Sequence, residues 1–94
     1  MDAAKAGALA KDYLEAGREL EAIEFFAKAG DRDALSALAA VAIERGDVFL
    51  MKAASVGLGE EPSTERWQEL ARAASEAGRH RDAESALRLA AVDA

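Results

Sequence analysis

The sequence contains no cysteine and only one histidine. The absence of cysteine excludes a disulfide scaffold and thiolate metal sites, and one histidine excludes any site built from several imidazoles. No apolar run approaches the roughly 20 residues that a bilayer span needs, and the N-terminus lacks the apolar segment of a secretory signal. We therefore expect a cytoplasmic protein that uses no metal and no cofactor.

Large apolar side chains are also scarce. Twenty-five of the 94 residues are alanine, which leaves twenty-three larger apolar residues to build a core. A chain of this size buries only about 60–70% of its unfolded surface, so close contacts between helices must replace one large core. The length fits a single domain over residues 1–94, and eighteen acidic against twelve basic residues give it a formal charge of −6.

Glycines divide the chain into segments rich in alanine, leucine, glutamate and arginine, which are strong helix formers. Gly30-Asp31 and Gly46-Asp47 read as pairs in which glycine ends one helix and aspartate begins the next. β-Branched residues never alternate with polar ones, so no strand is expected. The sequence predicts helices over 3–16, 18–29, 32–45, 48–57, 63–77 and 79–92. Because the connections are short, these six helices should form three antiparallel hairpins, at about 3–29, 32–57 and 63–92.

The first and third hairpins share a residue pattern around Gly17 and Gly78, the glycines between their two helices. Seven positions match in offset from the glycine: Leu9, Ala10, Tyr13, Gly17, Ala22, Phe26 and Ala29 in one, and Leu70, Ala71, Ala74, Gly78, Ala83, Leu87 and Ala90 in the other. Small residues in this pattern allow two helices to approach closely, and large ones fill the space between hairpins. We therefore read the chain as a helical repeat.

The pattern resembles the tetratricopeptide repeat, through Trp67-x-x-Leu70-Ala71 and the stretch 17–29. The second hairpin matches only in its first helix, because Met51 and Ser55 stand where alanine and an aromatic residue are expected, and the repeat-ending proline is absent. The resemblance implies an all-α fold of six helices, stacked as a short tetratricopeptide-like right-handed superhelix with an irregular middle. A plain helical bundle is the alternative.

In the tetratricopeptide family the first helix of each hairpin lines a concave groove that binds a peptide or a helix. The resemblance maps this groove onto Lys11, Leu14, Glu15, Asp33, Ser36, Ala40, Ile43, Glu44, Glu65, Gln68, Arg72, Ser75 and Glu76. The mapped residues carry two positive and five negative charges, so a basic or amphipathic protein segment is the expected partner. Leu14 and Ile43 would supply the apolar contacts. An equally simple interpretation is that these residues form the solvated faces of amphipathic helices.

The family's carboxylate clamp is not expected here, because the sequence has no asparagine and Gly7 stands at one of the clamp positions. We expect a protein-interaction module, with a small dedicated chaperone of a secreted or aggregation-prone helical protein as the alternative. No nucleophile motif, phosphate loop or zinc spacing points to an enzyme. The lone His80 has no second ligand nearby, and the acidic residues around Arg79 and Arg81 argue against nucleic-acid binding.

The last helix is expected to pack inward through Ala83, Ala86, Leu87 and Ala90. Leu89 and Val92 fall outside this stripe and form a candidate end-face interface, through which the chain would pair with a second copy or with a further hairpin. Scattered surface residues would explain them equally well. The five aromatic residues, Tyr13, Phe25, Phe26, Phe49 and Trp67, are expected mostly in the core.

Overall fold

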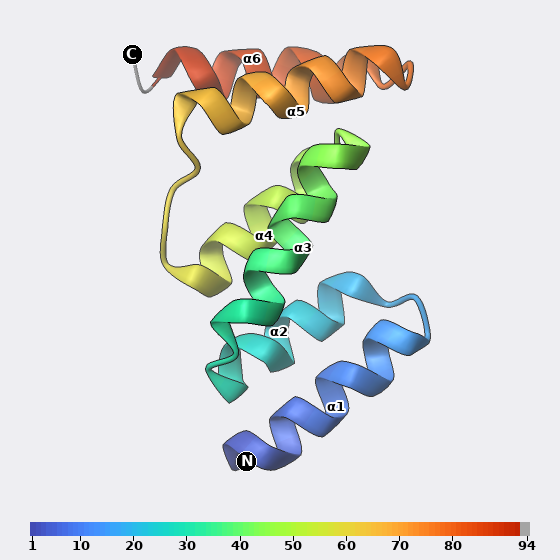
Figure 1. Ribbon diagram of the computed structural model, residues 1–94, viewed down its shortest axis with the longest axis vertical. Coiled ribbons are helices and arrows are strands. Elements are labelled where there is room, and N and C mark those ends of the chain that lie inside the picture. Colours follow the sequence, from blue (N-terminus) through green and yellow to red (C-terminus); the bar gives the residue numbers. More distant parts are fainter. Residues whose placement is uncertain (93–94) are drawn as a thin grey trace.

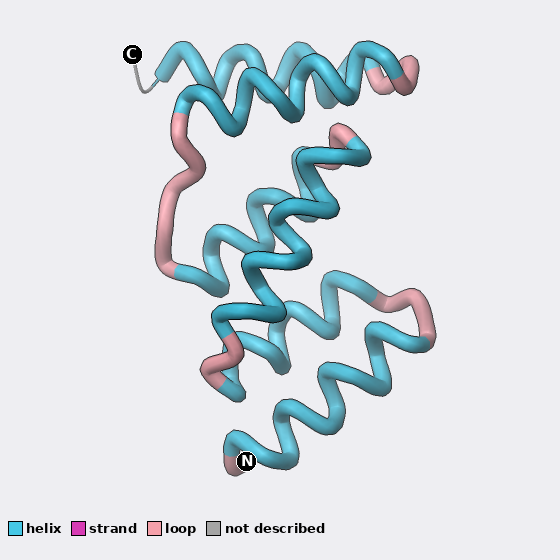
Figure 2. Tube along the Cα trace, viewed as in Figure 1, coloured by secondary structure: helices cyan, strands magenta, loops and turns pink. Residues whose placement is uncertain are grey.

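The computed structural model describes residues 1–92, and within this range every regular element is a helix (Figures 1 and 2). The six helices begin and end within about one residue of the predicted ranges. They are α1 (Ala3–Glu15), α2 (Glu19–Ala29), α3 (Arg32–Arg45), α4 (Val48–Leu58), α5 (Thr64–Glu76) and α6 (His80–Val92). The predicted all-α fold is therefore confirmed.

The helix ends have local causes in the sequence. Gly30, Gly46 and Gly59 adopt left-handed conformations at the C-terminal ends of α2, α3 and α4. The side chains of Asp31 and Asp47 then accept hydrogen bonds from backbone N–H groups in the first turns of α3 and α4. These contacts satisfy groups that a helix end leaves unpaired. They confirm that glycine ends one helix and aspartate begins the next at Gly30-Asp31 and Gly46-Asp47.

The helices pair as three hairpins, α1 with α2, α3 with α4, and α5 with α6. The hairpins are stacked along the longest axis of the molecule, as Figure 1 shows. The second hairpin contacts the first through α2, which lies against both α3 and α4. It contacts the third through α3 against α5 and through α4 against α6. Each hairpin therefore packs only against its neighbour in the sequence.

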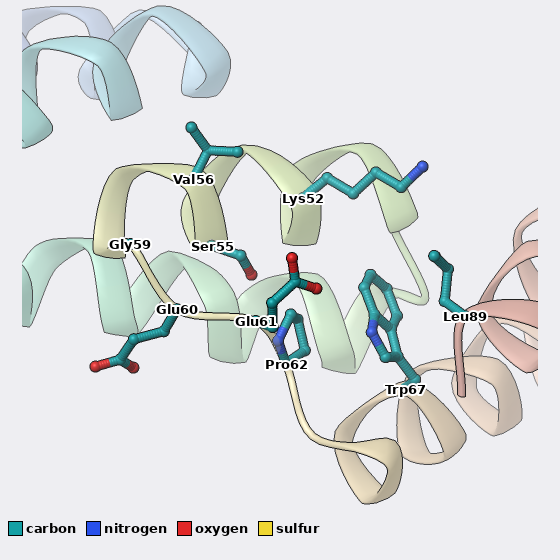
Figure 3. A pocket seen from close by; sticks show the side chains of 9 residues that line it. All are labelled: Lys52, Ser55, Val56, Gly59, Glu60, Glu61, Pro62, Trp67 and Leu89. Carbon is teal, nitrogen blue, oxygen red and sulfur yellow. The ribbon is translucent and has the colours of Figure 1, made fainter. Parts of the chain in front are cut away.

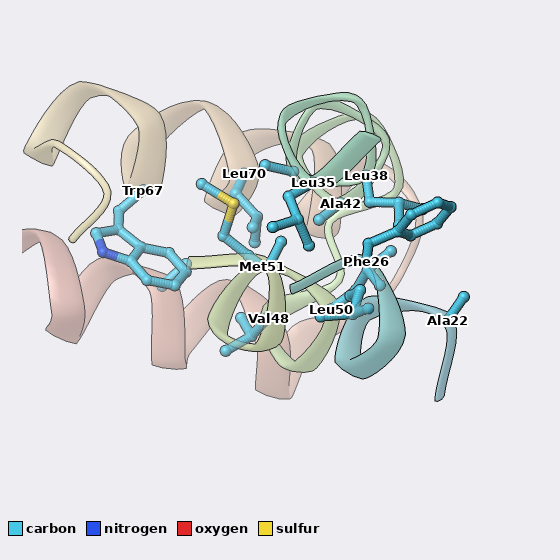
Figure 4. Packing of buried hydrophobic residues seen from close by; sticks show 14 of the residues in the cluster. Ala22, Phe26, Leu35, Leu38, Ala42, Val48, Leu50, Met51, Trp67 and Leu70 are labelled. Atoms are coloured by element: carbon cyan, nitrogen blue, oxygen red, sulfur yellow. The ribbon is translucent and has the colours of Figure 1, made fainter. Parts of the chain in front are cut away.

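One cluster of buried side chains runs through all three hairpins, from Ala10 in α1 to Ala90 in α6. Its small members include Ala22 of α2 and Ala71 of α5, which are both buried. Its large members lie mainly in the middle of the stack, where Met51 of α4 sits beside Leu70 and Trp67 of α5 (Figure 4). These large side chains therefore contribute to the contact between two hairpins as well as to the packing within one.

Gly46 lies very close to α5 at the contact between the second and third hairpins. Its φ angle is +71°, and a Cβ atom added to it would lie only 2.3 Å from the Cα atom of Ala74 in α5. Only glycine therefore fits at this position, both for its backbone conformation and for space. Gly59 has nearly the same φ angle, +70°, but faces open space.

This difference gives a matched pair of variants. We expect Gly46→Ala to lower the free energy of unfolding by about 2–5 kcal/mol, because left-handed strain and overpacking act together. Gly59→Ala carries only the strain and should lower it by about 1–2 kcal/mol. Urea unfolding followed by circular dichroism measures both, and equal losses would contradict the tight contact with Ala74.

Candidate interaction surfaces

The residues mapped onto the first helices lie on α1, α3 and α5, and most of them are exposed. Exposed side chains are Lys11, Leu14, Glu15, Asp33, Ser36, Ala40, Glu44, Glu65, Gln68, Arg72, Ser75 and Glu76. Ile43 differs, because it is half-buried and packs against the core. We call the surface formed by these residues the first-helix face.

The structure brings only part of the first-helix face together. α3 lies against α5, so the positions on these two helices are neighbours. α1 instead packs mainly against α2, and α2 separates it from the second hairpin (Figure 1). Lys11, Leu14 and Glu15 therefore lie apart from the positions on α3.

The charges of the first-helix face are not neutralised by ion pairs within residues 1–92. Its carboxylates, Glu15, Asp33, Glu44, Glu65 and Glu76, form no salt bridge there, and neither do Lys11 and Arg72. Five negative and two positive charges leave this face with an acidic excess. Its only large apolar side chain that is clearly exposed is Leu14, at 38%.

The second helices carry a surface of different chemistry. Leu20 of α2 is 54% exposed, and Phe49 and Val56 of α4 are 73% and 83% exposed. Phe49, Ala53 and Val56 follow the spacing i, i+4, i+7, so they form one stripe along α4. We call this stripe, together with Leu20, the α4 ridge. The expectation that the aromatic residues lie in the core is therefore wrong for Phe49, although Phe26 and Trp67 are buried.

Two hollows flank the α4 ridge. One, of about 540 Å³, lies between α2 and α4 and is lined by Leu20, Ile23, Glu24, Ala27, Lys28, Ala53, Val56 and Gly57. The other, of about 440 Å³, lies between α4, the segment 59–62 and the third hairpin. Figure 3 shows the edge of Trp67 in this second hollow, between Pro62 and Leu89, with Lys52 and Glu61 at its mouth. Val56 borders both hollows, so the ridge separates them.

The charged residues that line the hollow between α2 and α4 are paired, and so are Arg18, Glu19 and Glu21 near the N-terminal ends of these helices. Lys28 contacts Glu24 at 3.5 Å and lies 5.0 Å from the ring of Phe25. Arg18 contacts Glu21, and its guanidinium lies 5.0 Å from the ring of Tyr13. Glu19 accepts a hydrogen bond of 2.7 Å from Arg45. This surface is therefore apolar with a compensated rim, whereas the first-helix face is polar with an acidic excess.

The sequence contained a signal for the α4 ridge. The helix over Val48–Leu58 has apolar residues on all sides, with Lys52 as its only charged residue. A helix with apolar residues on all sides is normally buried by neighbouring elements on all sides. A helix at the surface of a thin stack has no neighbour for its outer side, so α4 leaves part of its apolar surface exposed.

The orientation of α6 corrects the expectation for the C-terminal end. Leu87, expected to point inward, is 56% exposed, whereas Leu89, expected at an exposed end, is half-buried against the core. The reason is that α6 packs against α4 as well as α5, and this rotates its buried stripe toward Leu89. Of the candidate end-face pair, only Val92 is widely exposed, at 79%.

The rotation of α6 predicts which leucine contributes to stability. Leu89→Ala should lower the free energy of unfolding by about 1–2 kcal/mol, roughly half the cost at a fully buried site. Leu87→Ala should change it by no more than about 0.5 kcal/mol. Urea unfolding of both variants tests this, and a larger loss for Leu87→Ala would restore the orientation expected from the sequence.

The described helices offer no other specialised site. None of those in residues 1–92 is long and apolar enough to cross a membrane, and the same residues contain no cluster of His, Cys, Asp and Glu that could hold a metal ion. The two faces are therefore the candidate sites. Comparisons of the chain with protein-family models, curated proteins and solved structures found no match.

Proposed function

We propose that this protein is a protein-interaction module of the tetratricopeptide-like kind, which binds a peptide or helical segment of a partner. The matching offsets around Gly17 and Gly78 support the repeat, together with the three stacked hairpins. Short stacks of hairpins offer an extended surface with little depth, which suits the recognition of protein segments.

The observation that carries this proposal is the exposure of the α4 ridge. Phe49 and Val56 are more than 70% exposed, whereas Leu50 and Met51 on the same helix are buried in the core cluster. Large apolar side chains that stay in water contribute no hydrophobic free energy to the stability of the isolated fold. A group of them beside hollows marks a surface that meets another molecule.

The first-helix face supports a second contact with a different partner chemistry. Its carboxylates form no salt bridge within the described helices, so they remain available to a basic segment. We keep the hypothesis that α3 and α5 bind such a segment, through Glu44, Gln68 and Glu76. Because these charges are exposed, the attraction would be screened by salt.

The first-helix hypothesis predicts a salt-sensitive interaction. A lysine-rich amphipathic peptide should shift backbone amide signals of α3 and α5 in NMR spectra, with affinity that falls as ionic strength rises. The double variant Glu44→Gln, Glu76→Gln should weaken binding by about threefold to tenfold, since exposed charge pairs contribute up to about 1 kcal/mol each. Affinity that is unchanged in this variant would rule out the first-helix face.

Site-specific photo-crosslinking in the native host tests the function itself. A photoreactive residue would replace Val56 on the α4 ridge, Ala40 on the first-helix face, or Glu84 on the outer side of α6 as a control; all three are exposed. A protein-interaction module should give discrete crosslinked products from Val56 or Ala40 and none from Glu84. Absence of discrete products at both surface positions would contradict the proposed function.

The dedicated chaperone is the competing proposal, and it is favoured by the same exposed ridge. A chaperone of this kind would cover the ridge with its client and lose stability or self-associate when alone. Thermal unfolding and sedimentation of the isolated chain separate the two. A stable monomer supports the interaction module, and an unstable or dimeric chain supports the chaperone.

A further inference from the structure

We propose that the hollow between α2 and α4 is the seat for one amphipathic helix of about three turns, whose contacting face is apolar and whose net charge is near zero. This inference rests on the proposed function and specifies its partner. It places the contact on the second helices, on the opposite helix of each hairpin from the groove that the tetratricopeptide resemblance implies.

The shape of this hollow fits a helix. Its lining combines the buried Ile23 and the small residues Ala27, Ala53 and Gly57 with the longer side chains of Leu20, Glu24, Lys28 and Val56. α2 and α4 pack closely beneath it, since a Cβ atom added to Gly57 would lie 3.1 Å from a methyl group of Leu35 and 3.6 Å from the Cβ atom of Ala27. The small residues in this lining would allow the backbone of a third helix to approach. Side chains on the two edges of that helix would then lie against the longer lining side chains.

The ridge supplies anchors at helical spacing. Leu20 and Phe49 line a further hollow at the N-terminal ends of α2 and α4, and Leu20 also borders the hollow between these helices. Val56 lies at the opposite end of the same groove. A partner helix with apolar residues at i, i+4 and i+7 would contact both ends, as in other helix-in-groove complexes.

The rim determines the charge of the occupant. Glu24 and Lys28 pair across one turn of α2, Arg18 pairs with Glu21, and Glu19 pairs with Arg45. A strongly basic or acidic helix would have to compete with these internal pairs, and it would gain little at an exposed rim. Burial of apolar surface is therefore the driving force, so affinity should depend only weakly on salt.

The length of the groove favours a single helix over a second copy of the domain. The 11 residues of α4 span about 16 Å, which matches about three helical turns. A typical stable complex of folded domains buries about 800 Å² on each partner. One short groove offers much less than this, so we expect weak binding, with a Kd in the range of about 10–500 μM.

Two designed peptides test the proposal by NMR titration of the full chain at low and at moderate ionic strength. Both are four-turn helices with leucines in one stripe; one carries equal numbers of Glu and Lys elsewhere, and the other carries only Lys. We expect the neutral peptide to shift signals of Leu20, Ala53 and Val56, with affinity that changes by less than about twofold with salt. Val56→Glu should weaken its binding at least about tenfold.

Leu87→Glu is the control, because Leu87 is a large apolar residue that is 56% exposed on α6 and belongs to neither candidate surface. It should bind the neutral peptide like the native chain. Phe49→Ser provides a second disruptive variant, and circular dichroism establishes that each variant is folded. Equal binding by the native chain and by folded Val56→Glu and Phe49→Ser overturns the proposal.

The remaining outcomes separate the groove from the function. Shifts of the neutral peptide confined to α3 and α5 would overturn the groove and leave the interaction module standing. Binding of only the Lys peptide would overturn the neutral occupant. Sedimentation that reveals a dimer dissociated by Val56→Glu would assign the ridge to a second copy instead. The proposed function fails separately, through the absence of crosslinked partners at both faces.

Discussion

The contact of Gly46 with Ala74 is the constraint on which the upper half of the stack depends. It brings the turn between α3 and α4 directly onto α5, at a distance that admits no side chain. This contact sets the third hairpin across the second, so that Trp67 and Leu70 reach Met51 (Figure 4). It also places α6 against α4, which leaves Leu89 half-buried and turns Leu87 to the solvent. The hollow beside Trp67 follows from the same arrangement, because Leu89 and Pro62 stand on its two sides.

Alanine makes this architecture possible and also limits it. Helices that cross at alanine approach closely, and the core then needs few large residues. Ala10, Ala22 and Ala54 are completely buried in this way. Such a core is thin, and each hairpin has neighbours only above and below it. The outer sides of α2 and α4 are therefore left without a covering layer, and the apolar character of α4 becomes visible at the surface.

The first-helix face and the α4 ridge differ in the range over which they attract other molecules. The carboxylates of the first-helix face form no salt bridge within residues 1–92 and outnumber its cations, so the negative field of this face extends into solvent. The surface around the α4 ridge pairs its charges with each other and exposes apolar groups, so its attraction acts only on contact. Under the proposed function, the first-helix face would attract a partner and the α4 ridge would bind it on contact. The formal charge of −6 gives no indication of this division, because it averages over both faces.

The sequence by itself determined the helices, their ends and their pairing into hairpins. Glycine and aspartate act within a few residues of each other at Gly30-Asp31 and Gly46-Asp47, so the causes of these ends are local and readable. It also indicated that Lys11, Arg72 and the acidic residues of the first helices are exposed, since their periodicity is that of an amphipathic helix. Only the tertiary structure decided which helix of one hairpin meets the next. That choice left Leu89 half-buried, separated α1 from α3 and exposed Phe49 and Val56. It depends on contacts between residues far apart in the chain, such as Gly46 with Ala74, whose fit no local pattern encodes.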